Sequence, residues 1–214
     1  MPMLEIWGRA DSSNTQAVMW LVGELGLPFE RYDVGHRFGG LDSPDFLAMN
    51  PNGTIPVIRD SGGPAIWETG AILRYLATCY APKQMWPDDP VRRADIDRWA
   101  EWAKLSVALR FTAPVFWRVV RTPSAERDED AIKRAINDLS RSFKIAEERL
   151  MNNKFLVCDT FTLADIQFGH VLFRWFDIAI DRPAFPALHR YYRDLSRRPA
   201  FKDHVMVSYS ALRE

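Results

Sequence analysis

Residues 50–76 are the part of this chain that most limits how it can fold. A tight loop, Asn-Pro-Asn-Gly-Thr, precedes a strand that begins at Pro56, and a Ser-Gly-Gly turn leads to a second strand. Glu68 and Thr69 then open a segment whose apolar residues recur at helical spacing. The segment therefore predicts a β-hairpin followed directly by a helix.

The residues before this hairpin predict a strand, a helix and a second strand. Residues 3–7 and 29–34 have strand character, and residues 14–25 repeat apolar side chains at helical spacing. The short connection implies that the two strands are parallel. The chain up to residue 80 thus reads βαβ followed by ββα, which is the order of a thioredoxin-like domain.

From residue 81 onward the strand patterns disappear and helical patterns dominate. Three prolines in residues 81–90 indicate a linker. We therefore expect an α/β domain in residues 1–80, this linker, and an all-α domain in residues 91–214. The helices of that second domain are predicted at 91–120, 126–152, 162–177, 185–197 and 199–207.

Composition narrows the possible functions. Lys and Arg number 28, as do Asp and Glu, which argues against a general nucleic-acid or anionic-membrane binder. No stretch approaches the ~20 apolar residues of a membrane span, and no leader segment is evident. Cys79 and Cys158 lie far apart and the four histidines are scattered, so we expect neither a metal site nor a disulfide framework. A cytoplasmic, reduced protein is expected.

The order and spacing of these motifs resemble the cytosolic glutathione transferase family, in particular its bacterial, serine-type, theta- or zeta-like members. The resemblance covers almost the whole chain, and it includes the box Thr162-Leu-Ala-Asp165 at the start of a helix. It implies that the first domain binds glutathione as co-substrate, without a metal. It also implies a hydrophobic electrophile bound against the all-α domain, and a homodimer.

Pro56 and the residue before it are expected to contact glutathione. In the family the equivalent proline is cis and turns the preceding N–H and C=O towards the ligand. The resemblance implies that Ile55 pairs with the cysteinyl backbone of glutathione, as a strand adds to a sheet edge. Taken alone, Pro56 would be read as an ordinary trans proline, because only about 5–6% of X-Pro bonds are cis.

Glu68 and Thr69 stand where a strand ends and a helix begins, and the free N–H groups of a helix start suit a carboxylate. The resemblance implies that Thr69 holds the γ-glutamyl carboxylate and Glu68 the ammonium group. The alternative is that Thr69 only caps its own helix.

His36 and Arg37 are weaker candidates, which by the same resemblance would face the glycyl carboxylate. At Thr54, relatives often carry a longer polar side chain.

The first strand–helix junction reads Asp-Ser-Ser-Asn at residues 11–14 and contains no cysteine, so the reacting thiol would belong to glutathione. A free thiol of this kind has a pKa of about 8.5. A hydroxyl donor at a helix N-terminus lowers it. Ser12 resembles the serine that does this in serine-type members, and Ser13 and Asn14 are rivals. The alternative is that one of the three merely caps the helix.

The electrophile would meet the long helix of the second domain. The resemblance assigns Phe111, Trp117, Arg118 and Arg121 to that pocket, although an aromatic stripe more often belongs to a core. Pro114 is expected to kink this helix. The expected activity is conjugation of glutathione to an apolar electrophile. The alternatives are a glutathione-dependent isomerase or reductive dehalogenase, and a non-catalytic relative that binds ligands or proteins.

Overall fold

The computed structural model describes residues 3–157 and 159–213. The chain divides into two compact units. The first comprises Met1–Ala81 and Ala200–Val207, and the second comprises Pro82–Pro199 and Ser208–Glu214. Cys158 lies outside the described residues. No helix in the described part of the chain is long and apolar enough to cross a membrane.

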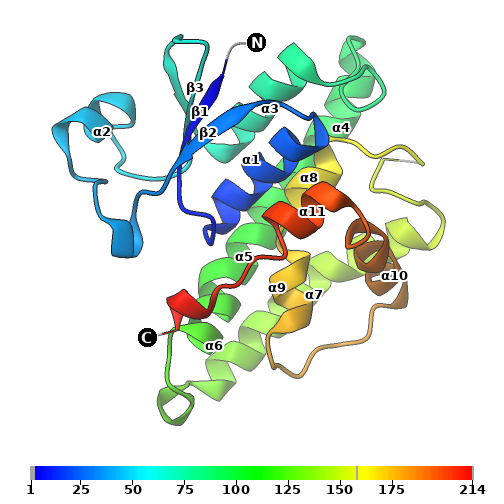
Figure 1. The fold of residues 1–214 in the computed structure, drawn as a ribbon. Helices are drawn as coiled ribbons and strands as arrows, with labels where there is room; N and C mark the ends of the chain where they lie inside the picture. The colour runs from blue at the N-terminus through cyan, green and yellow to red at the C-terminus, as the bar shows by residue number, and fades with distance from the viewer. Residues whose placement is uncertain (1–2, 158, 214) are drawn as a thin grey trace. The chain divides into compact units, whose positions relative to one another are not determined.

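The first unit is built on a four-stranded sheet in the order β2-β1-β3-β4. β1 runs parallel to β2 and antiparallel to β3, which is in turn antiparallel to β4. Figure 1 shows α1 and α3 on one face of this sheet and α2 on the other. The elements are β1 (Leu4–Trp7), α1 (Ser13–Glu24), β2 (Phe29–Tyr32), α2 (Pro44–Met49), β3 (Val57–Asp60), β4 (Ala65–Trp67) and α3 (Thr69–Tyr80). The predicted order, βαβ then ββα with a thioredoxin-like sheet, is confirmed.

The apolar faces predicted from helical spacing form the core of this unit. Val18, Leu21 and Val22 of α1 are fully buried, as are Ile72 and Leu76 of α3. Gly26 follows α1 with φ of +61°, a conformation that glycine adopts without a steric penalty, and the chain then turns towards β2.

The segment α11 (Pro199–His204) clusters with the first unit, whereas the sequence predicted one uninterrupted domain from residue 91 to the C-terminus. The reason is packing on α1. The Phe201 ring meets the Trp20 ring edge-on, with centroids 4.8 Å apart. A Cβ placed on Gly23 would lie 2.9 Å from the Cβ of Ala200, so a larger residue at position 23 would not fit. This match between distant segments cannot be read from helical periodicity.

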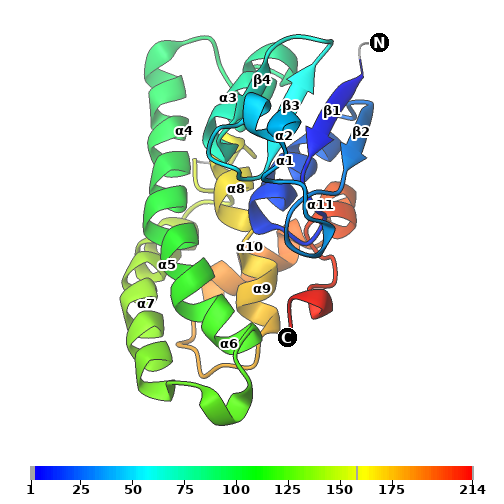
Figure 2. The ribbon, with the colours of Figure 1, turned by 90° about the vertical axis from the view of Figure 1, so that its left-hand side faces the viewer.

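The second unit contains helices but no strand in its described residues, and Figure 2 shows its long helices. Its α-helices are α4 (Pro90–Trp102), α5 (Leu109–Phe111), α6 (Arg118–Val120), α7 (Glu129–Met151), α8 (Leu163–Gly169), α9 (Leu172–Asp177) and α10 (Pro186–Leu195). The predicted helix 162–177 is therefore two helices, which separate after Gly169. Glycine is a poor residue for a helix interior, which favours the break there.

Two π-helical turns, Ala103–Ala108 and Thr112–Trp117, join α4, α5 and α6 into the helical stretch that the sequence predicted as 91–120. Pro114 lies inside the second turn. Proline has no N–H to donate and its ring clashes with the carbonyl four residues earlier. A wider turn at this point is consistent with that conflict, and it changes the direction in which the following side chains point.

The centre of the second unit is α8, in which all seven residues are buried. The capping box is present, as predicted: Asp165 accepts a hydrogen bond from the N–H of Thr162 at 2.8 Å. The same carboxylate accepts from the N–H of Leu156 and from the hydroxyl of Tyr191. Burial raises the pKa of Asp165 to about 6 despite these hydrogen bonds. Asp165 therefore joins the α8 start to two other segments.

In the first unit, Asp60 joins the β3–β4 turn to α3. Its carboxylate accepts hydrogen bonds from the hydroxyls of Ser61, Tyr75 and Tyr80 at 2.7, 2.9 and 2.5 Å. Burial alone would raise the pKa of Asp60, but the three hydrogen bonds favour the charged form and lower the pKa below its ordinary value. The same contact raises the pKa of Tyr80 to about 12.

Asp60→Asn should therefore lower the free energy of unfolding by about 2 kcal/mol at pH 7, because hydrogen bonds to a charged acceptor are lost. A depressed carboxyl pKa stabilises the fold above the unfolded-state value of about 4, and this gain is lost as pH falls through the folded-state pKa. The stability gap between wild type and variant should narrow on acidification, as measured by urea unfolding at each pH. Asp42→Asn, at an exposed carboxylate, is the control, and a pH-independent gap would contradict the argument.

Candidate functional site

Strand register brings the predicted glutathione contacts to one end of the sheet. Trp7 at the end of β1 pairs with Val57 at the start of β3, and Val57 pairs with Trp67 at the end of β4. The segments that leave β1, enter β3 and leave β4 therefore meet at that end. These segments carry the three sets of residues singled out in the sequence: 11–14, 55–56 and 68–69.

The Ile55–Pro56 peptide bond is cis, as predicted. Pro56 is buried and Ile55 is half-buried. Asn50 braces this loop: its side-chain Nδ2 donates to the carbonyl oxygen of Thr54 at 2.7 Å and to the Thr54 hydroxyl at 3.2 Å. Asn50 is 1% exposed and was not assigned a role from sequence. Its position in the Asn-Pro-Asn-Gly loop was the available signal.

Ser12 is the N-cap of α1, and its hydroxyl oxygen accepts from the N–H of Thr15 at 3.5 Å, a long bond. A serine that only accepts still has its own O–H to donate. Capping and donation to a sulfur are therefore compatible. Ser13 and Asn14 lie in the first turn of α1 and are partly exposed. The geometry brings all three candidates to the helix N-terminus.

Asp11 organises the loop in front of Ser12. Its carboxylate, 5% exposed, forms ion pairs with Arg9 at 2.9 Å and with Arg37 at 2.8 Å. Arg37 also lies over the ring of Phe38, 4.5 Å from its centroid. The sequence proposed Arg37 as a carboxylate contact but missed Asp11 as its partner, because the two residues are far apart along the chain. His36 is exposed, with φ of +52°.

At the start of α3, the N-cap is not the residue that capping preferences predict. Glu68, not Thr69, is the N-cap of α3, and its side chain forms no capping hydrogen bond. Thr69 is the first helical residue and is 2% exposed. Glu68 has φ of +69°, a backbone conformation that is unfavourable for any residue with a Cβ. Strain of this kind is concentrated at functional sites, and here it holds an exposed carboxylate outside the helix.

The residues predicted to meet the electrophile divide into two groups. Phe111 is 1% exposed and packs on Phe116 and Trp175, with ring centroids 5.9 and 6.0 Å away, so it belongs to the core of the second unit. Trp117 and Arg118 are exposed, and Arg121 is half-buried. The prediction of a pocket wall is thus unsupported for Phe111.

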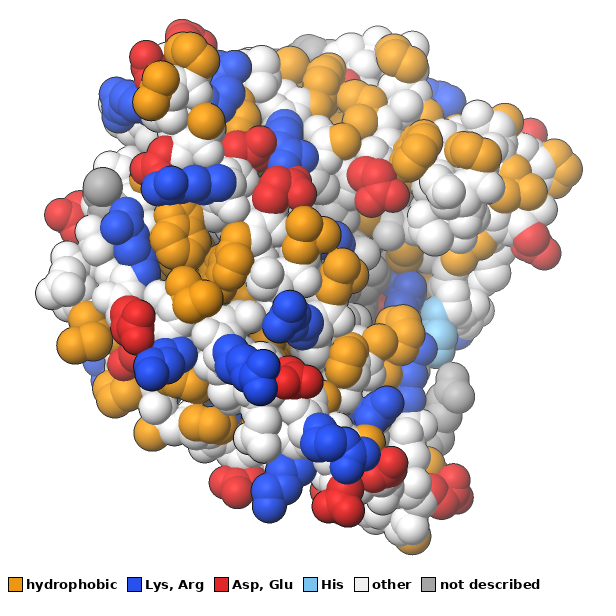
Figure 3. All heavy atoms as spheres, turned by 180° about the vertical axis from the view of Figure 1, so that it is seen from behind, with side chains coloured by type: hydrophobic (Ala, Val, Ile, Leu, Met, Phe, Trp, Pro, Cys, Tyr) orange, Lys and Arg blue, Asp and Glu red, His pale blue; other side chains and the backbone are white. Residues whose placement is uncertain are grey.

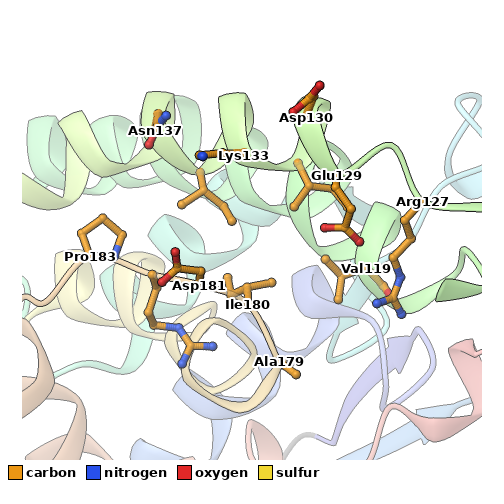
Figure 4. Close-up of a pocket in the computed structure, with 13 residues that line it drawn as sticks. Val119, Arg127, Glu129, Asp130, Lys133, Asn137, Ala179, Ile180, Asp181 and Pro183 are labelled. Carbon is orange, nitrogen blue, oxygen red and sulfur yellow. The ribbon is translucent and has the colours of Figure 1, made fainter. Parts of the chain in front are cut away.

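A cavity of about 590 Å³ lies elsewhere in the second unit, between the start of α7 and the loop after α9 (Figure 4). Its charged residues balance one another, and no predicted site residue lines it. These charged residues are Arg127, Glu129, Asp130, Lys133, Asp181 and Arg182. Balanced charge of this kind does not specify the charge of a ligand. Within the described residues, no group of three or more potential metal ligands is found.

Comparisons with known proteins give one consistent result. The family model "Glutathione S-transferase, N-terminal domain" matches residues 11–79, and "Glutathione S-transferase, C-terminal domain" matches residues 100–199. Glutathione S-transferase GstB of Escherichia coli is 36% identical over 209 residues, which is 97% of this chain and 100% of that protein. Glutathione S-transferase 3 of Zea mays is 31% identical and covers 96% of this chain and 94% of its own.

Solved structures agree with these sequence matches. The theta class glutathione S-transferase from Xanthomonas axonopodis pv. citri, with glutathione bound, has a TM-score of 0.91 and 39% identity, and covers 97% of this chain and 99% of its own. Ure2p in complex with glutathione has a TM-score of 0.83 at 22% identity, covering 95% and 93%, which shows a shared fold only.

Replacing Glu68 by glycine should raise the free energy of unfolding by about 1 kcal/mol, since glycine adopts a positive φ without a clash. Glu68→Ala keeps the Cβ and should give no such gain, and Glu68→Gln is a second control that keeps the side-chain shape. Urea unfolding of the three variants measures the difference. Equal stability of the Gly and Ala variants would show that this position is not strained.

Proposed function

The chain belongs to the glutathione S-transferase family, and on that premise we propose that Ser12 activates the glutathione thiol for attack on an electrophilic, largely apolar small molecule. The observation that supports this most is the position of Ser12 at the N-terminus of a 12-residue helix, with a hydroxyl proton available for donation. A helix N-terminus carries partial positive charge, so it favours a thiolate over a thiol.

The other predicted contacts have chemistry that suits the rest of glutathione. Ile55 offers backbone groups for the cysteinyl residue next to a cis proline. The exposed carboxylate of Glu68 suits an ammonium group, and Thr69 suits a carboxylate at the α3 N-terminus. Arg37, held in place by Asp11, suits a second carboxylate. His36 and Thr54 complete the proposed set, and Trp117, Arg118 and Arg121 form the proposed electrophile contacts.

In the proposed reaction a sulfur–carbon bond forms as the bond from that carbon to its leaving group breaks. The leaving group departs with the bonding electron pair, and the thiol proton has already passed to solvent. Ser12 donates a hydrogen bond to the sulfur and keeps its own proton. The chain therefore contributes position and electrostatic stabilisation, and it forms no covalent intermediate.

Ser12→Ala should raise the pKa of the bound thiol towards its free value of about 8.5 and lower kcat about 100-fold, since a preorganised donor to a developing charge is lost. The ultraviolet absorbance of the thiolate, titrated across pH with glutathione bound, measures the first effect. Ser13→Ala and Asn14→Ala are the matched controls. An unchanged Ser12→Ala enzyme, with a large loss in either control, would transfer the role to that neighbour.

We also propose a cytoplasmic homodimer, which the family resemblance supports. Light scattering at micromolar concentration should then give twice the mass of one chain. A mass equal to one chain would contradict the dimer. It would leave the proposed role of Ser12 intact, because every residue proposed to bind glutathione belongs to one chain.

A further inference from the structure

An exposed tryptophan marks one surface of the second unit. Trp117 is 41% exposed and is the sole tryptophan among the exposed large hydrophobic residues of the described chain. Arg121 lies one turn later, where its backbone N–H donates to the carbonyl oxygen of Trp117 at 2.8 Å. The Arg121 guanidinium is 4.6 Å from the centroid of the Trp117 ring. The two side chains thus form a platform with a flat apolar part and a cationic part.

The part of the helical stretch that carries this platform has charges of one sign, and acidic residues resume only at Glu126. Residues 102–125 contain no Asp or Glu, but they contain Lys104, Arg110, Arg118 and Arg121. In the described part of the chain, none of these three arginines forms an ion pair. Figure 3 shows acidic and basic side chains interspersed over one face of the molecule. Arg118 and Arg121, which lie one turn apart, therefore place two positive charges beside Trp117 in a chain with no net charge.

Arg121 also has a donor that the protein does not use. Its Nε is buried and has no hydrogen-bond partner among the described residues. A buried donor without an acceptor is unfavourable, and such groups in a native structure call for an explanation. The enclosed Nε is not accessible to a ligand, so an anionic ligand would bind the terminal N–H groups of the half-buried guanidinium. The π-helical turn at Thr112–Trp117 immediately precedes Arg118 and Arg121, and turns of this type are frequent at functional sites.

We propose that Trp117 and Arg121 bind an aromatic acceptor substrate that carries a carboxylate or a similar anionic group. The ring of the acceptor stacks on Trp117, and its anion receives hydrogen bonds from Arg121 in the field of Arg118. This inference rests on the proposed transferase function and specifies its second substrate. In this proposal Arg118 and Arg121 both attract the anionic group of the acceptor. An electrophile bound only by apolar packing would not require these charges.

The first test measures binding alone, with two probes that have no leaving group. Equilibrium dialysis should show that 3,5-dinitrobenzoate binds about tenfold more tightly than the neutral 3,5-dinitrobenzamide, as expected for one charge-assisted contact. Arg121→Gln should reduce that preference to about twofold or less. Trp117→Leu should weaken both probes alike. Equal affinity of the wild-type protein for the two probes would overturn the proposal.

The matched control is Arg134→Gln, which removes the same charge from an exposed position on α7. It should leave the preference for the benzoate intact, and an equal loss in this variant would reduce the effect to net charge and overturn the proposal. Arg121→Lys, which keeps the charge, should retain part of the preference. Circular dichroism confirms that each variant is folded.

Turnover separates this inference from the function on which it rests. The wild-type protein should conjugate glutathione to 4-chloro-3,5-dinitrobenzoate, releasing chloride. The rate enhancement over the uncatalysed reaction should be larger for this benzoate than for 4-chloro-3,5-dinitrobenzamide. Arg121→Gln should remove that difference. Turnover of both probes without a preference would overturn the inference and leave the transferase intact. Binding of the benzoate with no turnover of either chloro compound would contradict the proposed function instead.

Discussion

The pairing of β1, β3 and β4 is the constraint on which the proposed glutathione site depends. Because β3 is antiparallel to both neighbours, the ends of β1 and β4 and the start of β3 share one edge of the sheet. A shift of one residue in either pairing would turn every buried side chain of the strand to the other face. Val57 and Ile58 are fully buried, so the core that fixes the register also fixes the positions of the ligand-binding segments.

The sheet is the rigid part of the proposed site, and the reactive groups lie outside it. The strands supply buried anchors, and the groups with available chemistry lie just beyond the strand ends: the Ser12 hydroxyl and the Glu68 carboxylate. Helix α1 begins immediately after Ser12, and Glu68 is fixed by an unfavourable backbone angle. The Ser12 hydroxyl accepts one hydrogen bond as the N-cap but keeps its proton, and the Glu68 carboxylate forms no capping hydrogen bond, so both groups remain available to a ligand.

Sequence patterns predicted the elements of this fold well because those elements depend on neighbours in the chain. The capping box at Thr162 and Asp165 and the strand–helix order involve residues a few positions apart, whereas the cis bond before Pro56 was predicted only through the family resemblance. Contacts between distant segments were not predictable: the Asp11–Arg37 ion pair and the packing of Phe201 on Trp20 join residues from separate elements. The N-cap role of Glu68 was missed for another reason, since a positive φ at a non-glycine residue contradicts local preference.

The difference between local contacts and contacts of distant segments also explains why the acceptor substrate is harder to infer from sequence than glutathione. The proposed contacts to glutathione come largely from backbone groups and helix termini, which a motif can reveal. An acceptor is selected by exposed side chains, whose neighbours decide their chemistry: Arg121 would be an ordinary surface cation if a carboxylate lay beside it. Residues 102–125 include no acidic side chain, so no carboxylate from this stretch pairs with Arg121 where it contacts Trp117. Screening limits charge interactions to about 10 Å at moderate salt, so the nearby charges of Arg118 and Arg121 can select an anion although the whole chain is neutral.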